Sequence, residues 1–313
     1  MRRRRVRERV DLTAHVGSVT LPHPVMTASG TAGHGAELGR YVDLSTLGAV
    51  VVKSLSAEPW AGNPAPRVHE TAAGMINSVG LQGPGVAAWM SDELPPLIAA
   101  GARVVASIWG RSVEEYRRAA DLLADAPLEV VAVEVDMSCP NVAARRDVFA
   151  HAPETAAEVI AATAGCGRPR WAKLSPNVTD LPAIAGAVAD AGAEAVTLVN
   201  TVMGLAIDPA TRRPRLGAGG GGLSGPAIHP VAVRAVYDVR AAFVDLPIVG
   251  VGGVASAGDA VELLLAGAQA VQVGTATFAD PKAPHLVAAG LEQWCGRAGV
   301  RSLDELIGGV HGW

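Results

Sequence analysis

Short apolar runs alternate with longer segments of helical period along the whole chain. The apolar runs predict eight strands, at 24–28, 49–54, 103–109, 129–138, 170–176, 195–201, 247–253 and 270–276. Apolar positions at helical spacing predict helices at 87–100, 113–125, 153–165, 181–192, 226–242, 257–267 and 285–299. Several strands are apolar throughout, as expected when both faces of a parallel strand are buried. This alternation predicts an α/β fold, a (β/α)8 TIM barrel.

A doubly wound open sheet is the alternative, but the glycine fingerprint that should follow its first strand is missing. Three long segments, 57–86, 141–152 and 206–224, leave from the carboxyl ends of predicted strands. Barrel enzymes carry their chemistry at that end, so we expect long loops on the catalytic face. No domain boundary is visible, so residues 1–313 are expected to form a single domain.

Composition narrows the class of protein. Half of the chain is hydrophobic and only 4% is aromatic, which predicts an aliphatic core. The net charge of −4 gives no reason to expect a nucleic acid or a membrane as partner. Residues 1–12 are basic and are expected to be a frayed terminus, with no signal peptide or membrane span. The three cysteines, Cys139, Cys166 and Cys295, lack metal-ligand spacing, so we expect no metal and a cytoplasmic protein with reduced thiols.

The strand at 129–138 ends in a polar turn that contains Cys139, Pro140 and Asn141. The proline ends the strand, which leaves the thiol at the carboxyl end, where barrel enzymes place reactive groups. A small buried hydrophobe is an equally good interpretation of this cysteine taken alone.

The last two strands end in glycines, at Gly252 and Gly253 and at Gly274 before Thr275. Such glycines allow backbone N–H groups to approach a phosphate, and many barrels bind phosphate after strands seven and eight. Tight turns without a ligand are the alternative. Ser256 is the expected N-cap of the helix that begins near residue 257.

Two lysines, Lys53 and Lys173, lie inside apolar strands, where a cation needs an anionic or polar partner. Both could point at a single anionic ligand. Four amides lie at or beyond strand ends: Asn77, Asn141, Asn177 and Asn200. An amide both donates and accepts hydrogen bonds, which suits the edge of a flat polar heterocycle, although asparagine is also common in turns.

Taken together, these residues resemble the class 1 dihydroorotate dehydrogenases, and in particular the catalytic FMN subunit of the B type. The matching segments run in order along nearly the whole predicted fold: MTASGT at 26–31, VKS at 52–54, NPAPR at 63–67, NSVGLQ at 77–82, SCPN at 138–141, KLSPN at 173–177, VNT at 199–201, GLSGP at 222–226 and GVGG at 250–253. Each segment alone is weak evidence for this family, but the whole set in this order is specific to it.

The resemblance implies an FMN-binding barrel that oxidises (S)-dihydroorotate to orotate in de novo pyrimidine (UMP) biosynthesis. It implies that FMN contacts Ser29, Lys53, Ser54, Ser107, Asp136, Lys173, Val199 and Gly225, with its phosphate on Gly252, Gly253, Gly274 and Thr275. It implies that the substrate contacts Lys53, Asn77, Ser78, Val79, Gly80, Leu81, Asp136, Asn141, Asn200 and Thr201. Cys139 would take the C5 proton while hydride passes from C6 to flavin N5.

The resemblance also implies partners. In the B type, an iron–sulfur/FAD subunit passes the electrons on to NAD, and the catalytic subunits form a homodimer. This chain lacks cluster cysteines and a dinucleotide fingerprint, so it fits the catalytic subunit alone.

Two positions depart from the family pattern. Asp136 and Ser107 stand where the family has asparagines. An aspartate there loses two N–H donors and can add a charge beside an anionic substrate. A related FMN oxidoreductase that acts on another dihydropyrimidine or cyclic imide is therefore the alternative function. A flavin-binding regulatory barrel without catalysis is a more distant one, because it would leave Cys139 and both lysines idle.

Overall fold

The computed structural model describes residues 10–137 and 152–312. Eight parallel strands form one sheet in the order β3-β16-β15-β10-β9-β8-β7-β4. Their bounds are β3 Val25–Thr27, β4 Val50–Val51, β7 Val104–Ile108, β8 Val130–Asp136, β9 Arg170–Lys173, β10 Ala195–Leu198, β15 Ile248–Val251 and β16 Ala270–Val273. Each lies inside one of the eight predicted runs. The strands are shorter than predicted because, in several of the predicted runs, the chain leaves the sheet before it reaches the polar residues at the end of the run.

The two edge strands, β3 and β4, meet and nearly close the sheet into a barrel. The Gly48 N–H donates to the Val25 carbonyl at 2.8 Å, and the Thr27 N–H donates to the Ala49 carbonyl at 3.3 Å. The Thr27 hydroxyl accepts from the Val51 N–H at 2.9 Å, on the inner side of this seam. The predicted (β/α)8 barrel is confirmed.

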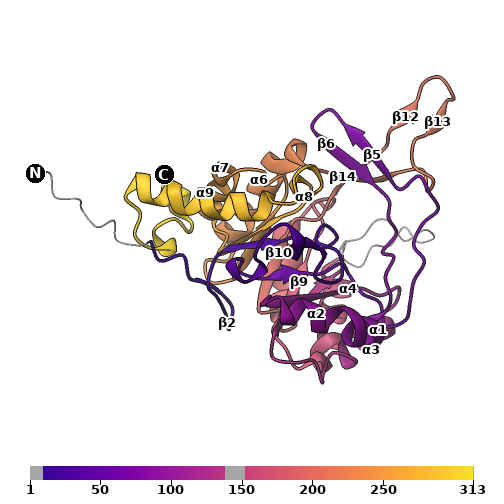
Figure 1. Cartoon of the computed structure of the whole chain (residues 1–313), viewed down its shortest axis with the longest axis horizontal. Helices are drawn as coiled ribbons and strands as arrows, with labels where there is room; N and C mark the ends of the chain where they lie inside the picture. The colour runs from indigo at the N-terminus through magenta and orange to yellow at the C-terminus, as the bar shows by residue number, and fades with distance from the viewer. Residues whose placement is uncertain (1–9, 138–151, 313) are drawn as a thin grey trace, which may run out of the picture.

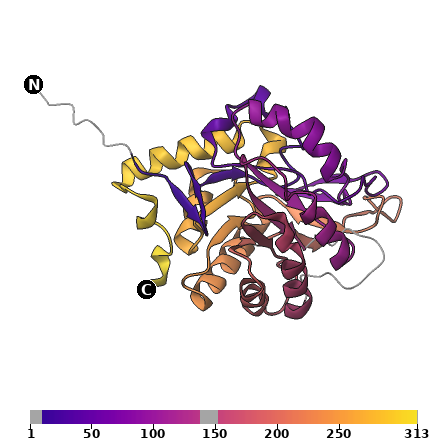
Figure 2. The same cartoon turned by 90° about the horizontal axis from the view of Figure 1, so that it is seen from below.

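Helices surround the barrel, as Figure 2 shows. The α-helices are α1 Val86–Ala88, α2 Leu94–Ala99, α3 Val113–Asp121, α4 Pro153–Ala162, α5 Leu181–Asp190, α6 His229–Ala242, α7 Ala257–Ala266, α8 Ala276–Ala279 and α9 Ala283–Ala298. Short 3-10 turns are η1 Glu37–Arg40, η2 Leu44–Thr46, η5 Thr163–Cys166, η6 Pro226–Ile228, η7 Leu303–Glu305 and η8 Gly309–Gly312. Ser256 caps α7 as predicted, in a capping box with Asp259.

The predicted helix at 87–100 is interrupted. A π-helical turn, η3 Trp89–Glu93, separates α1 from α2, which begins immediately before Pro95 and Pro96. Proline has no N–H to donate to the carbonyl four residues earlier, so a regular α-helix cannot continue through this pair.

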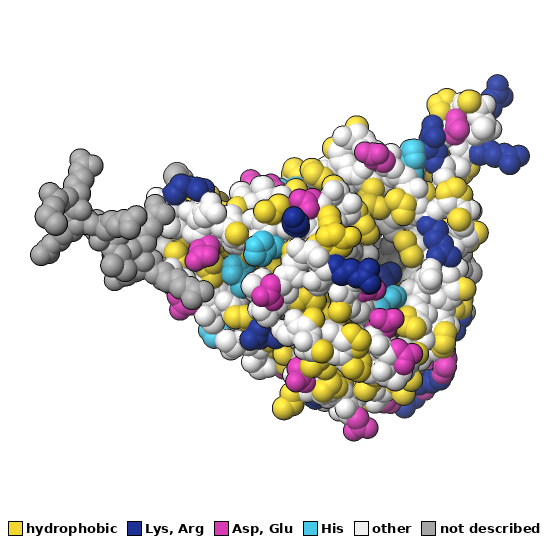
Figure 3. Space-filling model, viewed as in Figure 1, with side chains coloured by type: hydrophobic (Ala, Val, Ile, Leu, Met, Phe, Trp, Pro, Cys, Tyr) yellow, Lys and Arg dark blue, Asp and Glu magenta, His cyan; other side chains and the backbone are white. Residues whose placement is uncertain are grey.

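Two of the three long segments, 57–86 and 206–224, form a second sheet together with residues 202–204, and the sequence did not predict this sheet. It is antiparallel, in the order β11-β14-β6-β5, with bounds β5 Val68–Thr71, β6 Gly74–Asn77, β11 Val202–Gly204 and β14 Gly221–Ser224. Beside it, β12 Ile207–Asp208 and β13 Arg213–Pro214 form a hairpin (Figure 1). Lys and Arg side chains gather on this hairpin in Figure 3, and they include the exposed Arg212 and Arg213. A further hairpin, β1 Ala14–Val16 and β2 Val19–Leu21, precedes the barrel.

The core is aliphatic, as the composition predicted, with Ala, Val, Leu and Ile side chains between the sheet and the helices. Trp89, Trp109 and Trp171 are the large aromatic exceptions among the fully buried side chains. Within 10–137 and 152–312, no helix has the length and apolar character needed to cross a membrane.

Candidate active site

A cavity opens at the carboxyl ends of the barrel strands, between the barrel and the four-stranded sheet. Its wall contains most of the predicted site residues: Ser29, Lys53, Ser54, Asn77, Val79, Gly80, Leu81, Asp136, Lys173, Val199, Asn200, Thr201, Gly225, Gly252, Gly253, Gly274 and Thr275. They come from seven barrel strands or the turns after them, from the long segment at 57–86 and, for Gly225, from the turn after residue 224, so the fold collects them from distant parts of the sequence.

One side of the cavity is lined by backbone. Gly225, Gly252 and Gly253 have φ values of +97°, +137° and +72°, which side chains of L-amino acids rarely adopt. A Cβ on Gly225 would lie 2.7 Å from the Gly74 Cα, so close packing also requires glycine there. A wall of bare peptide groups with no side chains in front of it suits a phosphate.

Lys173 lines the cavity from β9 and belongs to a buried network. Its Nζ lies 3.1 Å from a carboxylate oxygen of Glu134, which has no exposed surface. The Gln272 side-chain amide donates to the other Glu134 oxygen at 2.8 Å. The buried cation thus has the anionic partner that its strand position required, and that partner belongs to the protein.

Lys53 also lines the cavity, and its aliphatic stem lies against Gly30. Burial and the nearby Lys53 ammonium both lower the pKa of His34. His34 is therefore neutral at physiological pH, and Lys53 brings the positive charge to this side of the cavity.

Asp136 is buried at the end of β8, and both of its carboxylate oxygens are hydrogen-bonded. Oδ2 accepts from the Ser54 hydroxyl at 3.0 Å, and Oδ1 accepts from the Asn200 amide at 3.2 Å. The Ser54 hydroxyl also lies 3.1 Å from that of Ser29 and 3.0 Å from that of Ser107. The carboxylate therefore acts as the acceptor at the end of a chain of hydroxyl groups.

Residues 11–294 match the family model for dihydroorotate dehydrogenase. The chain belongs to this family. It is 49% identical to the dihydroorotate dehydrogenase B (NAD(+)) catalytic subunit of Desulforudis audaxviator, over 97% of this chain and 98% of that protein. The protein of the same name from Geotalea daltonii is 47% identical over 96% of this chain and 98% of its own length. The B-type resemblance seen in the sequence is confirmed.

The fold of the family is also found among solved structures. The crystal structure of DHODH from Eimeria tenella in complex with ferulenol superimposes with a TM-score of 0.76, covering 96% of this chain and 89% of that one. At 19% identity this likeness supports the fold alone.

Two residues predicted from the family pattern lie behind the cavity wall instead of on it. Ser107 is completely buried and reaches the site through Ser54. The Ser78 hydroxyl accepts from the Asn63 amide at 2.9 Å and is turned away from the cavity. The sequence places both next to lining residues but does not show which way a side chain points once the strand has ended.

The four predicted amides are divided. Asn77 and Asn200 line the cavity. Asn177 does not, because its amide donates to the Thr201 carbonyl at 3.0 Å and its oxygen accepts from the Met203 N–H at 2.8 Å. It is a turn residue, the alternative interpretation. Asn141 and the predicted catalytic Cys139 lie outside the described residues.

Sequence reasoning missed the residues that hold the 79–81 segment in place. The Asn63 N–H donates to the Val79 carbonyl at 3.0 Å, and the Trp60 indole N–H donates to the Gly80 carbonyl at 3.0 Å. The Arg67 guanidinium donates to the Asn63 carbonyl at 2.6 Å. The NPAPR motif was the available signal, and its role here is to support the cavity wall.

Proposed function

We propose that this protein oxidises (S)-dihydroorotate to orotate as the catalytic subunit of a B-type, NAD-linked dihydroorotate dehydrogenase. The two relatives above carry that name over nearly their full length. The observation that carries the proposal is the cavity, whose wall combines the glycines expected at a phosphate with the lysine and amides expected at the substrate.

The cavity fits FMN, since the bare peptides of Gly252, Gly253 and Gly274 suit its phosphate. Ser29, Ser54, Val199, Gly225 and Thr275 would hold the rest of the cofactor, with Lys53, Asp136 and Lys173 near its ring. Bound FMN supplies the acceptor for the hydride that leaves C6 of the substrate.

The protein's own groups bind the substrate and move the proton. Lys53 balances the carboxylate of dihydroorotate, while Asn77 and Asn200 bond the edge of its ring. The segment 79–81, held by Asn63 and Trp60, lines the cavity and would contact the substrate. The Cys139 thiolate takes the C5 proton and acts as a base, not as a nucleophile.

The same proposal covers the assembly. A partner subunit with an iron–sulfur cluster and FAD receives the electrons, and two catalytic subunits pair as a homodimer. We propose that the whole chain is one FMN-binding domain that works in the cytoplasm, where the buried Cys166 and Cys295 stay reduced.

One observation favours a second candidate, a related oxidoreductase for an uncharged dihydropyrimidine or cyclic imide. Asp136 presents a buried carboxylate to the cavity that dihydroorotate, itself an anion, must enter. Like charges in a poorly solvated site repel, and a neutral ring would avoid this cost.

Anaerobic reduction of the flavin tests the proposal. Dihydroorotate should bleach the visible flavin absorbance of the wild-type protein, while the uncharged rings dihydrouracil and dihydrothymine should not. Cys139→Ala should retain the flavin and bleach at least about 100-fold more slowly, because its base is missing. Bleaching by a neutral ring but not by dihydroorotate would favour the second candidate. A flavin that none of these compounds bleaches would contradict both.

A further inference from the structure

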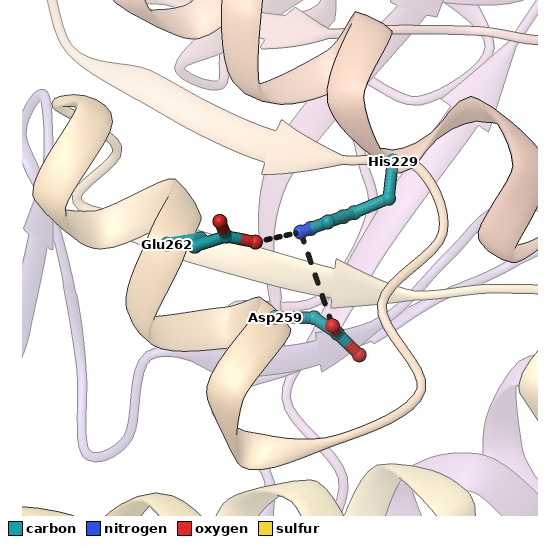
Figure 4. Close-up of side chains that lie close together, drawn as sticks. All are labelled: His229, Asp259 and Glu262. Atoms are coloured by element: carbon teal, nitrogen blue, oxygen red, sulfur yellow. Dashed lines mark hydrogen bonds and ion pairs between the residues drawn. The ribbon is translucent and has the colours of Figure 1, made fainter.

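A histidine that the sequence analysis did not assign lies directly behind the glycine wall. His229 is the first residue of α6 and is 8% exposed. Figure 4 shows its ring directed at Glu262 and Asp259. The Nδ1 atom lies 2.8 Å from the Gly252 carbonyl oxygen, and Nε2 lies 2.9 Å from Glu262 Oε2 and 4.0 Å from Asp259 Oδ1.

The partners of the ring fix its orientation. A backbone carbonyl can only accept a hydrogen bond, so the Nδ1–H of the ring donates to the Gly252 carbonyl. On the other side of the ring, Nε2 lies against the Glu262 carboxylate, and Asp259, whose other oxygen caps α7, lies beside it.

The contact with Gly252 has a consequence for the next peptide group. The Gly252 C=O and the Gly253 N–H belong to one planar trans peptide, so they point in opposite directions. With the carbonyl held toward His229, the N–H of Gly253 points away from it. Gly252 and Gly253 line the cavity, whereas His229 does not. Among the described residues, no hydrogen bond engages the Gly253 N–H.

We propose that His229 is a positioning residue for the flavin phosphate. The imidazole ring, anchored by Glu262, fixes the Gly252–Gly253 peptide so that the Gly253 N–H is directed at the phosphate. A hydrogen bond on the C=O also polarises that peptide and strengthens its N–H as a donor. This inference rests on the proposed function in one respect, namely that the cavity binds FMN through these glycines.

A purely structural role is the competing explanation. His229 joins the start of α6 to α7, and its loss could loosen both helices without any specific effect on phosphate. The two roles differ in one measurable way. A structural defect weakens every flavin that occupies the cavity, whereas a defect in the peptide's orientation weakens only a flavin that carries a phosphate. Riboflavin, which is FMN without the phosphate, separates them.

Two substitutions dissect the ring. His229→Gln places an amide nitrogen near the position of Nε2 and leaves the Gly252 carbonyl without its donor. His229→Asn places an amide nitrogen near the position of Nδ1 and can restore a neutral hydrogen bond to that carbonyl. Glu262→Gln removes the anchoring charge while it keeps an acceptor. Asp238→Asn is the matched control, because Asp238 lies on α6, the helix that begins at His229, and its carboxylate pairs with Arg234 at the surface.

The experiment is titration of the flavin-free full-length protein with FMN and with riboflavin, followed by quenching of flavin fluorescence. EDTA is present so that no divalent cation occupies the His229, Asp259 and Glu262 side chains. We expect His229→Gln to lower the affinity for FMN about tenfold and to leave that for riboflavin within about twofold. His229→Asn should recover part of the loss, Glu262→Gln should show a smaller one, and Asp238→Asn should bind as wild type.

Three results would overturn the proposal. Equal losses for FMN and riboflavin in His229→Gln, with a lowered melting temperature of the flavin-free protein, would establish the structural role. Unchanged FMN binding in both His229 variants would remove any role in phosphate binding. Wild-type protein that binds riboflavin as tightly as FMN would show that these glycines hold no phosphate, which contradicts the cofactor assignment itself and not only the role of His229.

Discussion

At the scale of single residues, Asp136 bears most directly on whether the substrate is anionic or neutral. Asp136→Asn replaces one carboxylate oxygen by an amide nitrogen. Its oxygen can still accept from Asn200, and its nitrogen can donate to Ser54, whose hydroxyl then reverses. Removing a buried negative charge should lower the KM for anionic dihydroorotate about tenfold. Steady-state kinetics with dihydroorotate and with uncharged dihydrouracil checks this.

The control for Asp136→Asn is Glu129→Gln, an exposed carboxylate just before the same strand, which should leave both substrates unaffected. If Asp136→Asn raised the KM for dihydroorotate, the carboxylate would be a contact that the substrate needs, and it would not be a group that repels the substrate. A lower kcat/KM for dihydrouracil in Asp136→Asn would support the second candidate function, because the carboxylate would then be a contact that the neutral ring needs.

The cysteines give a second residue-scale prediction. Burial raises the pKa of both the Cys166 and the Cys295 thiols, so little thiolate is present at neutral pH. Iodoacetamide at pH 7.5 should modify neither in the folded protein, whereas the proposed base Cys139 should react and should be protected by orotate. Peptide mass spectrometry of native and denatured samples measures this. Equal labelling of Cys166 in both samples would contradict its burial.

Single residues also show which contacts could not be predicted from the sequence. The apolar context of Lys173 correctly demanded an anionic or polar partner. It could not identify that partner, because Glu134 reaches the lysine from β8, and Gln272, which donates to Glu134, comes from the distant strand β16. The motif around Asn177 suggested a ligand contact, but its amide satisfies backbone groups of the next turn.

At the scale of elements, the glycine wall can be tested by adding a single methyl group. In Gly253→Ala the new Cβ would lie 2.6 Å from the His229 Cβ, at a φ of +72° that alanine disfavours. We expect a loss of about 1–3 kcal/mol in the free energy of unfolding and weaker FMN binding. Thermal denaturation and flavin titration measure the two effects.

Gly296→Ala is the matched control for Gly253→Ala. Gly296 lies inside α9, and a Cβ there would meet nothing within 4 Å. Alanine in a helix interior should stabilise the protein by about 0.5–1 kcal/mol and leave flavin binding unchanged. Comparable destabilisation by both substitutions would contradict the account of the glycine wall.

The elements predicted well are those with strong apolar periodicity. The strands of the barrel are rich in Val, Ile and Ala, and all eight were located. The four-stranded sheet was missed because Gly74–Asn77 and Gly221–Ser224 lack such runs and pair across a separation of 145 residues. The helix at 87–100 was predicted as continuous because its apolar spacing persists through Pro95 and Pro96, while the backbone hydrogen bonds do not.

At the scale of the whole molecule, one histidine connects the barrel seam to the helical layer. His23 precedes β3, and its Nδ1 accepts from the Val25 N–H at 3.1 Å. Its backbone carbonyl packs so closely on Gly48 that a Cβ there would lie 2.1 Å from it. Gly48 also donates to Val25 across the seam. Because Nδ1 accepts a hydrogen bond, the His23 ring is neutral. Its protonation would disturb the seam between β3 and β4, where the barrel closes.

Acid should destabilise the protein through this histidine. Burial lowers the pKa of His23 to about 4 from a usual 6.5. As the pH falls below 6.5, the pKa of this histidine in the unfolded chain, the unfolded chain binds a proton. The folded chain does not bind that proton until the pH reaches about 4. The free energy of unfolding should thus fall by about 3 kcal/mol across this window, with no effect of His23 above it. Urea denaturation between pH 7 and pH 4 measures the fall.

His23→Asn isolates this contribution from that of the many carboxylates that also titrate in acid. The asparagine oxygen can accept from the Val25 N–H in place of Nδ1, and it takes up no proton in this range. The variant should be slightly less stable than the wild type at pH 7, because it fills less space beside α9, and it should lose less stability on acidification. Its stability should therefore overtake that of the wild type near pH 5. Two curves that fall in parallel from pH 7 to pH 4 would show that His23 is protonated as readily in the folded protein as in the unfolded chain.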